Sequence, residues 1–262
     1  MGILNITPDS FSDGGAFLKL SQAQARANYM VEHGADLIDI GGESTRPGAE
    51  PVGVQAELDR VIPIIEAIRK ECDICISIDT SKPEVMDAAV SAGAGLINDV
   101  RALSREEAIL IAVKLKVPVI LMHMQGTPES MQAAFNYTTS VIEEINHFFK
   151  QQVQRCQNYG LEKNNILLDP GFGFGKSLIH NLQIMKYFST FKYHKMPLVL
   201  GVSRKSSLGL LLNKPINERL IGGVALSVMA AMDGVAILRT HDVDETKQAL
   251  QVVEAVKLKG SM

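Results

Sequence analysis

Cysteines, aromatic residues, long apolar runs and net charge are all scarce in this sequence. The 262 residues include three cysteines and no tryptophan, and aromatic residues make up 5% of the chain. Three cysteines are too few, and an odd number, for a disulfide framework, which favours a reducing compartment and a cytoplasmic location. The longest weakly polar run, Ile221 to Met232, is too short to cross a bilayer and indicates a buried helix, so no membrane segment is expected.

The charge balance excludes some classes of partner. The formal net charge is −3, whereas binding to nucleic acid or to a membrane surface calls for a basic face. We therefore expect neither partner, and an anionic ligand would need a local basic pocket. The chain opens on a strand-like Gly-Ile-Leu-Asn run instead of a charged region followed by an apolar one, so no secretory leader is expected.

Cys72 and Cys75 have the spacing of a redox motif. The second cysteine lies inside a strand-like run instead of at a helix N-terminus, where a thiolate would be stabilised. No second Cys or His pair follows at ligand spacing, so a metal site here is equally poorly supported. A structural role is the favoured interpretation.

Short β-branched runs alternate with amphipathic stretches, which is typical of βα units around a parallel sheet. Each run is nearly continuous in apolar residues, as expected for strands that are buried on both faces. The runs span Gly2–Ile6, Leu37–Ile40, Ile74–Asp79, Gly95–Asn98, Pro118–Met122, Ile166–Asp169, Leu198–Val202 and Val235–Leu238. Eight such units predict an α/β fold, the closed (β/α)8 or TIM barrel.

Helical spacing is clearest from Leu58 to Ile68, where apolar residues return to one face. Pro63 interrupts this stretch and is expected to kink the helix or to begin a fresh first turn. A further helix is expected over residues 139–158. Two are expected between the seventh and eighth strands, near residues 205–212 and 217–232, so one helix is additional to the barrel pattern.

No flexible linker, charge block or long repeat divides the chain, so we expect a single domain, residues 1–262. A doubly wound open sheet is the main rival architecture. Against it, the turn after the first strand lacks the G-x-G-x-x-G pattern of dinucleotide-binding folds and carries NITPDS at residues 5–10 instead.

Polar residues close nearly every apolar run, and the carboxyl ends of barrel strands are where this fold builds its active site. These residues are Asn5, 39–43, Asp79, Asn98, Asp99, His123, Asp169, 203–205 and 239–241. One such residue alone is usually a strand cap, but together they predict a polar ligand site. Patterns typical of zinc hydrolases and serine hydrolases are missing, so carboxylates, amides and one lysine are expected to bind a flat polar heterocycle.

Two segments point to a phosphate. Ser203-Arg204-Lys205 closes the seventh run and Arg239-Thr240-His241 closes the eighth, and the loops after strands seven and eight are the usual phosphate site of this barrel. A phosphate or pyrophosphate is the expected ligand. Two Gly-rich polar loops, residues 7–15 and 41–48, follow strands on the same face and are expected to act as lids.

Ordered motifs along nearly the whole chain resemble the dihydropteroate synthase family. They are residues 5–14 (NITPDSFSDG), 39–48 (DIGGESTRPG), 78–80 (IDT), 98–99 (ND), 121–126 (LMHMQG), 169–176 (DPGFGFGK), 203–206 (SRKS) and 239–243 (RTHDV). The resemblance implies an enzyme that joins a dihydropterin pyrophosphate to 4-aminobenzoate with Mg²⁺, releasing pyrophosphate. It also implies competition by sulfonamides and a homodimer.

The resemblance further implies roles for individual residues. Those expected to hold the pterin are Asp79, Asn98, Asp169 and Lys205, and Met122 is a further expected substrate-binding residue. Those expected to gather the pyrophosphate are Asn5, Arg239 and His241, with Asn5 the expected ligand of Mg²⁺, which leans on substrate phosphate. Those expected around 4-aminobenzoate are Thr45, Arg46, Pro47, Phe174, Ser203 and Lys205.

A dissociative, SN1-like course without a covalent enzyme intermediate is the expected mechanism. The pterin ring can stabilise the developing cation, while Mg²⁺, Arg239 and His241 stabilise the leaving group. Asp79 and Asp169 favour the electron-poor pterin, so these two aspartates, Lys205, Arg239 and His241 are the expected catalytic group. Family members carry a further stretch before the Met-Gly-Ile-Leu-Asn segment, so a shortened N-terminus is also expected.

Three alternative functions stay open at this point. A pterin-dependent methyltransferase would share the barrel and the pterin pocket, but the basic residues and the loop at residues 45–46 favour pyrophosphate chemistry. A pterin-binding protein without catalysis should show gaps among the motif residues, and none is evident. A phosphate-binding barrel aldolase should carry a Schiff-base lysine inside strand six, which has none.

Overall fold

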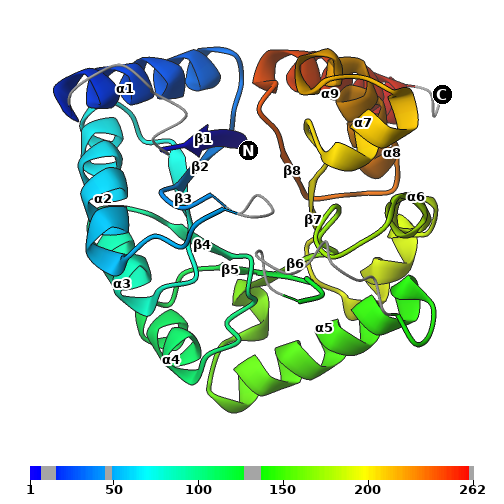
Figure 1. Ribbon diagram of the computed structural model, residues 1–262, viewed down its shortest axis with the longest axis horizontal. Helices are drawn as coiled ribbons and strands as arrows, with labels where there is room; N and C mark the ends of the chain where they lie inside the picture. Colours follow the sequence, from blue (N-terminus) through cyan, green and yellow to red (C-terminus); the bar gives the residue numbers. More distant parts are fainter. Residues whose placement is uncertain (7–15, 45–48, 127–136, 260–262) are drawn as a thin grey trace.

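The computed structural model describes residues 1–6, 16–44, 49–126 and 137–259, with the side chains of residues 16–19, 258 and 259 outside this description. Eight parallel strands stand in a ring within these residues, and helices surround them (Figure 1). The strands are β1 (Gly2–Asn5), β2 (Leu37–Gly41), β3 (Cys75–Asp79), β4 (Leu96–Asp99), β5 (Val119–Met122), β6 (Ile166–Asp169), β7 (Val199–Gly201) and β8 (Ile237–Arg239).

The ring closes through two short contacts. Strands β1 to β6 form one sheet in sequence order, and β7 pairs with β8. Leu168 bridges to Leu198 just before β7, and Gly2 bridges to Thr240 just after β8. The Ile3 amide also donates to the Thr240 carbonyl at 2.9 Å. Each strand therefore has a parallel neighbour on both sides, which confirms the expected barrel and excludes the open sheet.

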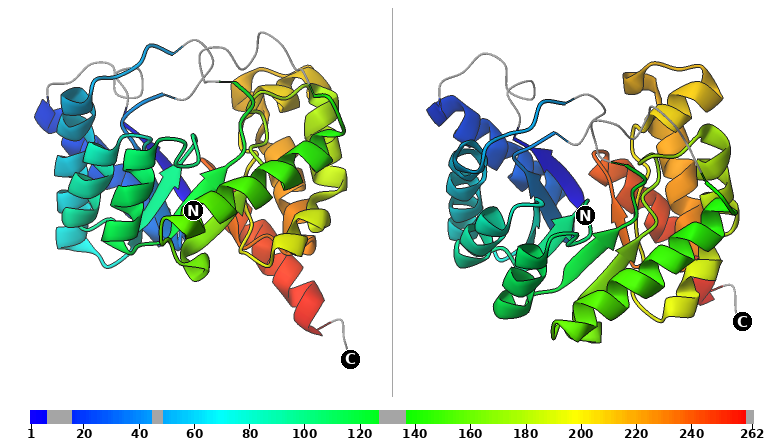
Figure 2. Two further views of the ribbon diagram at one scale, coloured as in Figure 1. Left: turned by 90° about the horizontal axis from the view of Figure 1, so that it is seen from below. Right: turned by 60° about the horizontal axis from the view of Figure 1, so that its bottom comes forward.

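Helices cover the outside of this ring, and Figure 2 shows them packed beside the strands. They are α1 (Ala16–Glu32), α2 (Val54–Glu71), α3 (Pro83–Ser91), α4 (Glu106–Leu115), α5 (Val141–Asn158), α6 (Leu178–Lys186), α7 (Ser206–Leu212), α8 (Leu220–Met232) and α9 (Val243–Lys259). Helices α7 and α8 both lie between β7 and β8, so the additional helix is confirmed. Ser140 begins α5 with a full capping box, in which its side chain accepts from the Glu143 amide.

Element boundaries differ from the sequence-based prediction by up to three residues, for local reasons. Pro118 precedes β5 because proline has no amide to donate to the ladder. Val235 donates to the Ala230 carbonyl and so closes helix α8, which delays β8 to Ile237. The expected interruption at Pro63 is absent as a helix boundary, since α2 runs continuously through it.

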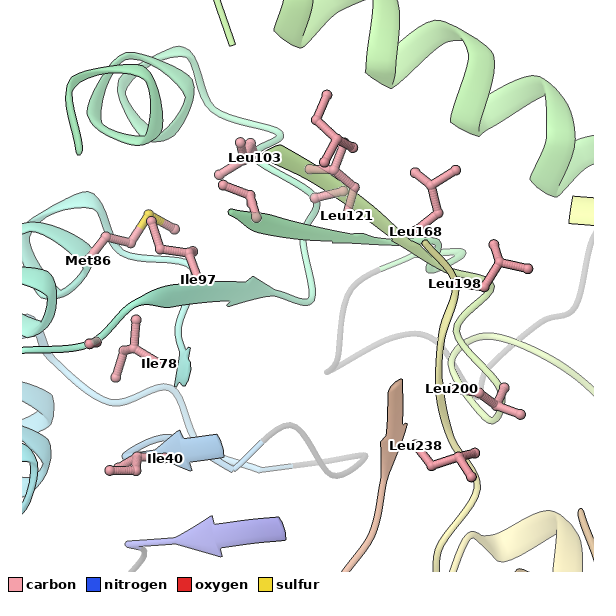
Figure 3. Close-up of a cluster of buried hydrophobic side chains, with 14 of the residues drawn as sticks. Ile40, Ile78, Met86, Ile97, Leu103, Leu121, Leu168, Leu198, Leu200 and Leu238 are labelled. Atoms are coloured by element: carbon pink, nitrogen blue, oxygen red, sulfur yellow. The ribbon is translucent and has the colours of Figure 1, made fainter. Parts of the chain in front are cut away.

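The main core lies between the ring and the helices. Figure 3 shows Ile40, Ile78, Ile97, Leu121 and Leu168 from successive strands, together with further leucines and Met86 of α3. These side chains are almost completely buried. Helix α2 contributes Val61, Ile65 and Ile68 to the same core, because its apolar residues recur at helical spacing and so lie on one face. Burial on this outer side of the strands is the dominant stabilisation of the fold.

A second, smaller core fills the barrel interior. Its buried members are Met1, Leu96, Ile120, Leu167 and Val199, and the half-buried Leu37 and Ile237 pack against them. Successive side chains of a strand point to opposite faces, which is why Leu96 points inward while its neighbour Ile97 joins the outer core. This apolar layer closes the barrel below the site described next. No helix among the described residues is long and apolar enough to cross a membrane.

Candidate functional site

The alternation along each strand places the site residues. The residue two positions after each inward apolar residue also points inward, one step nearer the carboxyl end of the strand. This relation takes Leu37 to Asp39, Leu96 to Asn98, Ile120 to Met122, Leu167 to Asp169 and Ile237 to Arg239. The strand register aligns them: Asn5 pairs with Gly41, Gly41 with Asp79, and Asp79 with Asn98. The polar layer thus lies directly above the inner apolar layer.

Arg239 is held between two carboxylates in this layer. Its Nε donates to Asp39 at 2.5 Å and one Nη donates to Asp79 at 2.6 Å. Asn98 donates to the same Asp39 oxygen at 3.1 Å. Asp39 is completely buried, and its other carboxylate oxygen has no partner among the described residues. A buried ion group of this kind fixes the guanidinium at one place in the barrel mouth.

Burial raises the pKa of Asp79 to about 7, with Arg239 acting against this rise and the neighbouring Asp39 adding to it. A carboxyl group with such a pKa is easily tuned by a ligand, because a modest change in local charge moves it between its two protonation states. Two carboxylates around one arginine therefore leave Asp79 poised near neutral pH.

Asp169 and Lys205 form the other side of the mouth. Asp169 accepts a 2.7 Å hydrogen bond from the Gly171 amide, and burial raises its pKa to about 6. The Lys205 ammonium lies 3.9 Å from the centre of the Phe174 ring, a cation–π contact. Burial, reinforced by Arg239, lowers the pKa of Lys205 to about 8. A hydrogen-bond acceptor and a donor thus face the same space.

An apolar wall completes this part of the site. Val100, Met122 and Phe174 form a buried cluster with Met124 packed against it. Val100 follows β4 and Met122 ends β5, so the wall joins neighbouring strand ends. A flat apolar surface beside carboxylates, an amide and a lysine suits a planar ring that carries hydrogen-bonding groups on its edge.

Ser203 ties the ends of β7 and β8 together. The His241 amide donates to its Oγ at 3.2 Å, and the ring Nδ1 of His241 lies 3.1 Å from the same oxygen. Ser203 also donates to Asp242, which pairs with Arg204. Burial, with Arg239 and Arg204 nearby, lowers the pKa of His241 to about 3. His241 is therefore a neutral hydrogen-bonding group beside the Arg239 guanidinium.

The loop after β2 is anchored by a carboxylate and an ammonium. Glu43 accepts from the Val52 amide at 2.9 Å and from the Lys82 ammonium at 2.6 Å. The same ammonium donates to Glu57 at 2.5 Å, and Glu57 is completely buried in α2. We name Glu43, Lys82 and Glu57 the loop clasp. The expected aminobenzoate residues Thr45, Arg46 and Pro47 belong to this loop and lie outside the described residues. The other residues expected at that site, Phe174, Ser203 and Lys205, are described.

Asn5 ends β1 at the mouth and is half-buried. No group of three His, Cys, Asp or Glu side chains that could hold a metal ion occurs among the described residues. A single amide oxygen fits Mg²⁺, which binds through few protein groups and takes its remaining ligands from water and phosphate. The donor set here is therefore compatible with Mg²⁺ and unsuited to zinc.

The structure gathers most of the residues expected from the sequence and adds two, Val100 and Lys176. Asp79, Asn98, Met122, Asp169, Lys205, Arg239 and His241 all lie at the carboxyl ends of the strands. Asp39 was expected only as one of the polar residues 39–43 at the end of the second strand, without a role of its own, and Val100 was not expected to contribute. Lys176, which is 3% exposed, was noted only as part of a motif. Its acceptors are backbone carbonyls and the ring of His123, 53 positions away, so residue types and spacing carry no signal for it.

Comparisons with known proteins agree with this geometry. Residues 1–241 match the family described as pterin binding enzymes. The dihydropteroate synthase of Escherichia coli K12 is 51% identical over 255 residues, 97% of this chain and 90% of that protein. The Yersinia pestis dihydropteroate synthase in a sulfonamide complex is 51% identical, with a TM-score of 0.93 over 98% of this chain and 93% of that one. The Xanthomonas albilineans enzyme in complex with 7,8-dihydropteroate is 41% identical, with a TM-score of 0.88 over 98% and 93%.

These matches extend over the strand ends that carry the polar layer, and they are far above the level at which only a fold is shared. The chain therefore belongs to the pterin binding enzymes, among the dihydropteroate synthases.

Proposed function

We propose that the chain condenses 6-hydroxymethyl-7,8-dihydropterin pyrophosphate with 4-aminobenzoate to give 7,8-dihydropteroate. The bond between the pterin methylene carbon and the pyrophosphate oxygen breaks, a carbon–nitrogen bond forms, and the arylamine loses a proton. The observation that carries this proposal is the barrel mouth itself. It sets the Asp79 and Asp169 carboxylates and an apolar wall beside the cations Lys205 and Arg239.

The acceptors of the mouth suit a pterin. Asp169 would accept hydrogen bonds from the 2-amino edge of the ring, and Lys205 would donate to ring acceptors. Asp79 and Asn98 would bind further edge groups from adjacent strands β3 and β4, where they are register partners. Met122 and Phe174 would contact the ring face. A ring bound this way points its substituent toward the strands that carry the basic residues.

The pyrophosphate would lie near Arg239 and His241. A neutral His241 donates a hydrogen bond without adding charge, while Arg239 supplies the positive charge. Asn5 would hold Mg²⁺, which, when bound to the pyrophosphate oxygens, supplies charge neutralisation for the leaving group. To reach the pyrophosphate, Arg239 would share or exchange its bond to Asp79, so substrate binding and the state of Asp79 are linked.

4-Aminobenzoate would enter beside the pterin methylene carbon. Thr45, Arg46 and Pro47 would contribute from the β2 loop, with Phe174, Ser203 and Lys205 opposite. Support comes from the relative crystallised with dihydropteroate, which contains this aryl group, and from the relative crystallised with a sulfonamide. Sulfonamides would accordingly compete with 4-aminobenzoate for this chain.

The activity is tested by mixing the purified chain with both substrates and Mg²⁺. We expect stoichiometric release of pyrophosphate and formation of dihydropteroate, and chelation of Mg²⁺ should abolish both. Lys205→Ala and Asp169→Asn should lower turnover at least about a hundredfold while the protein stays folded. Absence of pyrophosphate release with both substrates present would refute the activity, and wild-type turnover in either variant would refute that residue's role.

The course of the reaction is SN1-like in this proposal. The pterin ring stabilises a developing methylene cation, and Asp79 and Asp169 strengthen that stabilisation electrostatically. If the carbon–oxygen bond ionises reversibly before attack, ¹⁸O placed in the bridging position will scramble into nonbridging positions without 4-aminobenzoate. Absence of scrambling in the presence of an unreactive aminobenzoate analogue, with an enzyme that turns over normally when 4-aminobenzoate is supplied, would instead favour direct displacement.

A homodimer is also part of the proposal. Helices α7 and α8 pack together and leave large apolar side chains uncovered, with Leu210 and Ile221 exposed to 71% and 83%. Uncovered apolar groups of this size are typical of protein interfaces. Light scattering should give twice the chain mass, and Ile221→Asp should shift it toward the monomer. A cytoplasmic location stays a prediction, supported by three cysteines that are all free.

A further inference from the structure

Lys176 is a buried lysine whose ammonium is enclosed by backbone carbonyls. The residue is 3% exposed, and no carboxylate among the described residues lies within ion-pair distance of it. Its Nζ donates to the carbonyls of Gly171 at 2.9 Å, Phe174 at 3.0 Å and His123 at 3.1 Å. The Nδ1 of His123 lies 2.9 Å from the same Nζ. A buried ammonium needs such a set of acceptors, because it has given up its water.

The loop between β6 and α6 is wound around this ammonium. Gly171, Gly173 and Gly175 adopt φ angles of +68°, +85° and +63°, which turn successive peptide groups in opposite senses. A Cβ on Gly171 would lie 1.8 Å from the His123 carbonyl oxygen. The loop is thus pressed against the end of β5, and its carbonyls point inward as they do around a bound metal cation.

The same loop carries two groups of the active site. Its Gly171 amide donates to Asp169, and its Phe174 ring lies beneath the Lys205 ammonium. Gly171 and Phe174 are also two of the three residues whose carbonyls bind Lys176. One residue therefore fixes, through one turn of backbone, both the carboxylate and the ring that we assign to the pterin pocket.

The opposite side of the loop is fixed independently of the ammonium. Asn181 accepts from the Gly173 amide at 2.7 Å and donates to the Lys176 carbonyl at 3.2 Å. These bonds use the backbone of Lys176 and leave its side chain free for the inward carbonyls. Replacing the side chain alone should therefore disturb the inner face of the loop, where Asp169 and Phe174 lie, more than its attachment to α6.

We propose that Lys176 is a positioning residue for pterin recognition, with its ammonium acting as a built-in cation that shapes the β6–α6 loop around Asp169 and Phe174. The inference rests on the proposed roles of those two residues. Lys176 is almost fully buried and its ammonium donates to protein carbonyls, so it acts through the loop that carries them. Burial lowers the pKa of Lys176 to about 7, with Asp169 acting in the opposite direction.

The test measures the affinity of the folded protein for 6-hydroxymethylpterin by fluorescence titration. Lys176→Met keeps the length of the aliphatic part of the side chain and removes the ammonium. We expect the Kd to rise at least about tenfold, the usual scale when a group that orients binding residues is lost. Gln152→Met is the matched control, because Gln152 is also buried and donates to the carbonyls of Ala102 and Leu103 in another loop. The control should change the Kd less than about twofold.

A merely structural role is distinguished by chemical rescue. Lys176→Ala leaves space for n-propylammonium, which replaces the missing carbons and nitrogen, whereas tetramethylammonium has no N–H to donate. Propylammonium should restore at least half of the lost pterin affinity and tetramethylammonium none. If Lys176→Met does not fold, Lys176→Ala purified with propylammonium and then dialysed serves for the same titration.

Parallel titration of Asp169→Asn separates the inference from the proposed pocket. Lost affinity in Asp169→Asn together with wild-type affinity in Lys176→Met would overturn the role of Lys176 alone. Wild-type affinity in Asp169→Asn would overturn the pocket assignment first. Equal losses in Lys176→Met and Gln152→Met, without rescue by propylammonium, would likewise overturn the inference.

Discussion

The Arg239 guanidinium lies 2.6 Å from the Asp79 carboxylate across the barrel mouth, although 160 residues separate the two in sequence. Asp39 shares the same guanidinium, so two carboxylates compete for one positive charge. The competition explains why Asp79 has a pKa near neutral instead of the low value typical of a carboxylate paired with arginine. Binding of an anion by Arg239 would change this balance.

Asp39→Asn should lower the pKa of Asp79, because it removes a neighbouring negative charge and leaves Asp79 as the one carboxylate that pairs with Arg239 among the described residues. With an ionised Asp79 needed for pterin binding, the acid limb of kcat/KM for the pterin substrate should move about one pH unit lower. Asp36→Asn is the control, because Asp36 is exposed and pairs only with Lys247 in the described residues. An unchanged or higher midpoint in Asp39→Asn would show that the two carboxylates are not coupled.

Strand alternation explains how much of this site the sequence could predict. Asp79, Asn98, Asp169 and Arg239 close apolar runs, so their convergence followed from the barrel alone. Asp39 lies inside its strand, two positions before the end, so the list of strand-end residues included it only within residues 39–43 and gave it no role. The inward parity that it shares with Leu37 indicates its place in the polar layer.

The enclosure of Lys176 shows a different limit. Its acceptors are carbonyls, which every residue carries, and the sequence cannot say which of them turn inward. Gly171, Gly173 and Gly175 indicate an unusual backbone, yet the same glycine pattern suits many loops. His123 joins the group from 53 positions away, at the end of β5. Such contacts depend on the register of β5 and β6, which is a tertiary property.

The pH profile of kcat/KM for the pterin substrate should be bell-shaped. Burial raises the pKa values of Asp79 and Asp169 to about 7 and about 6, so the activity should rise with pH as these groups ionise. Burial lowers the pKa of Lys205 to about 8 and that of Lys176 to about 7, so activity should fall as these two ammonium groups lose their protons. His241, with a pKa of about 3, should add no limb.

Variants assign the two limbs. Lys205→Arg should keep its charge at high pH and remove the part of the alkaline limb with a midpoint near pH 8, whatever it does to the maximum rate. His241→Gln should lower the rate without moving either midpoint. A limb near pH 8 that persists in Lys205→Arg would assign that limb to another group.

The loop clasp should affect one substrate more than the other. Glu43 joins the Val52 amide at the far end of the β2 loop to Lys82, which follows β3. Glu43→Gln keeps the shape and weakens both bonds, and the residues between carry the proposed aminobenzoate contacts. We expect the KM for 4-aminobenzoate to rise about three- to tenfold, with the pterin Kd changed less than about twofold.

The matched control for the clasp is Asp87→Asn, which breaks the exposed pair with Lys114 on the helices α3 and α4. An exposed pair contributes little, so neither substrate constant should change. Equal increases in both substrate constants for Glu43→Gln would mean that the clasp supports the whole mouth. If Glu43→Gln raises neither constant, the loop clasp has no role in substrate binding.

Gly171→Ala should be among the most destabilising single-methyl changes in this barrel. The residue has a φ of +68°, and the added Cβ would lie 1.8 Å from the backbone oxygen of His123, so the loop must move away from β5. Strain at the positive φ and loss of the enclosed Lys176 contacts together should cost about 3 kcal/mol or more in the free energy of unfolding.

Gly53→Ala is the comparison, because nothing lies within 4 Å of its added Cβ. Gly53 is the N-cap of α2 and has a φ of −66°, which alanine also adopts. The alanine would stabilise the protein by lowering the entropy of the unfolded chain and destabilise it as a poorer N-cap, so the two effects oppose each other. Its change should stay within about 0.5 kcal/mol. Urea unfolding of both variants measures the difference. Similar unfolding midpoints would show that the loop around Lys176 can move to accept the added methyl group at little cost in stability.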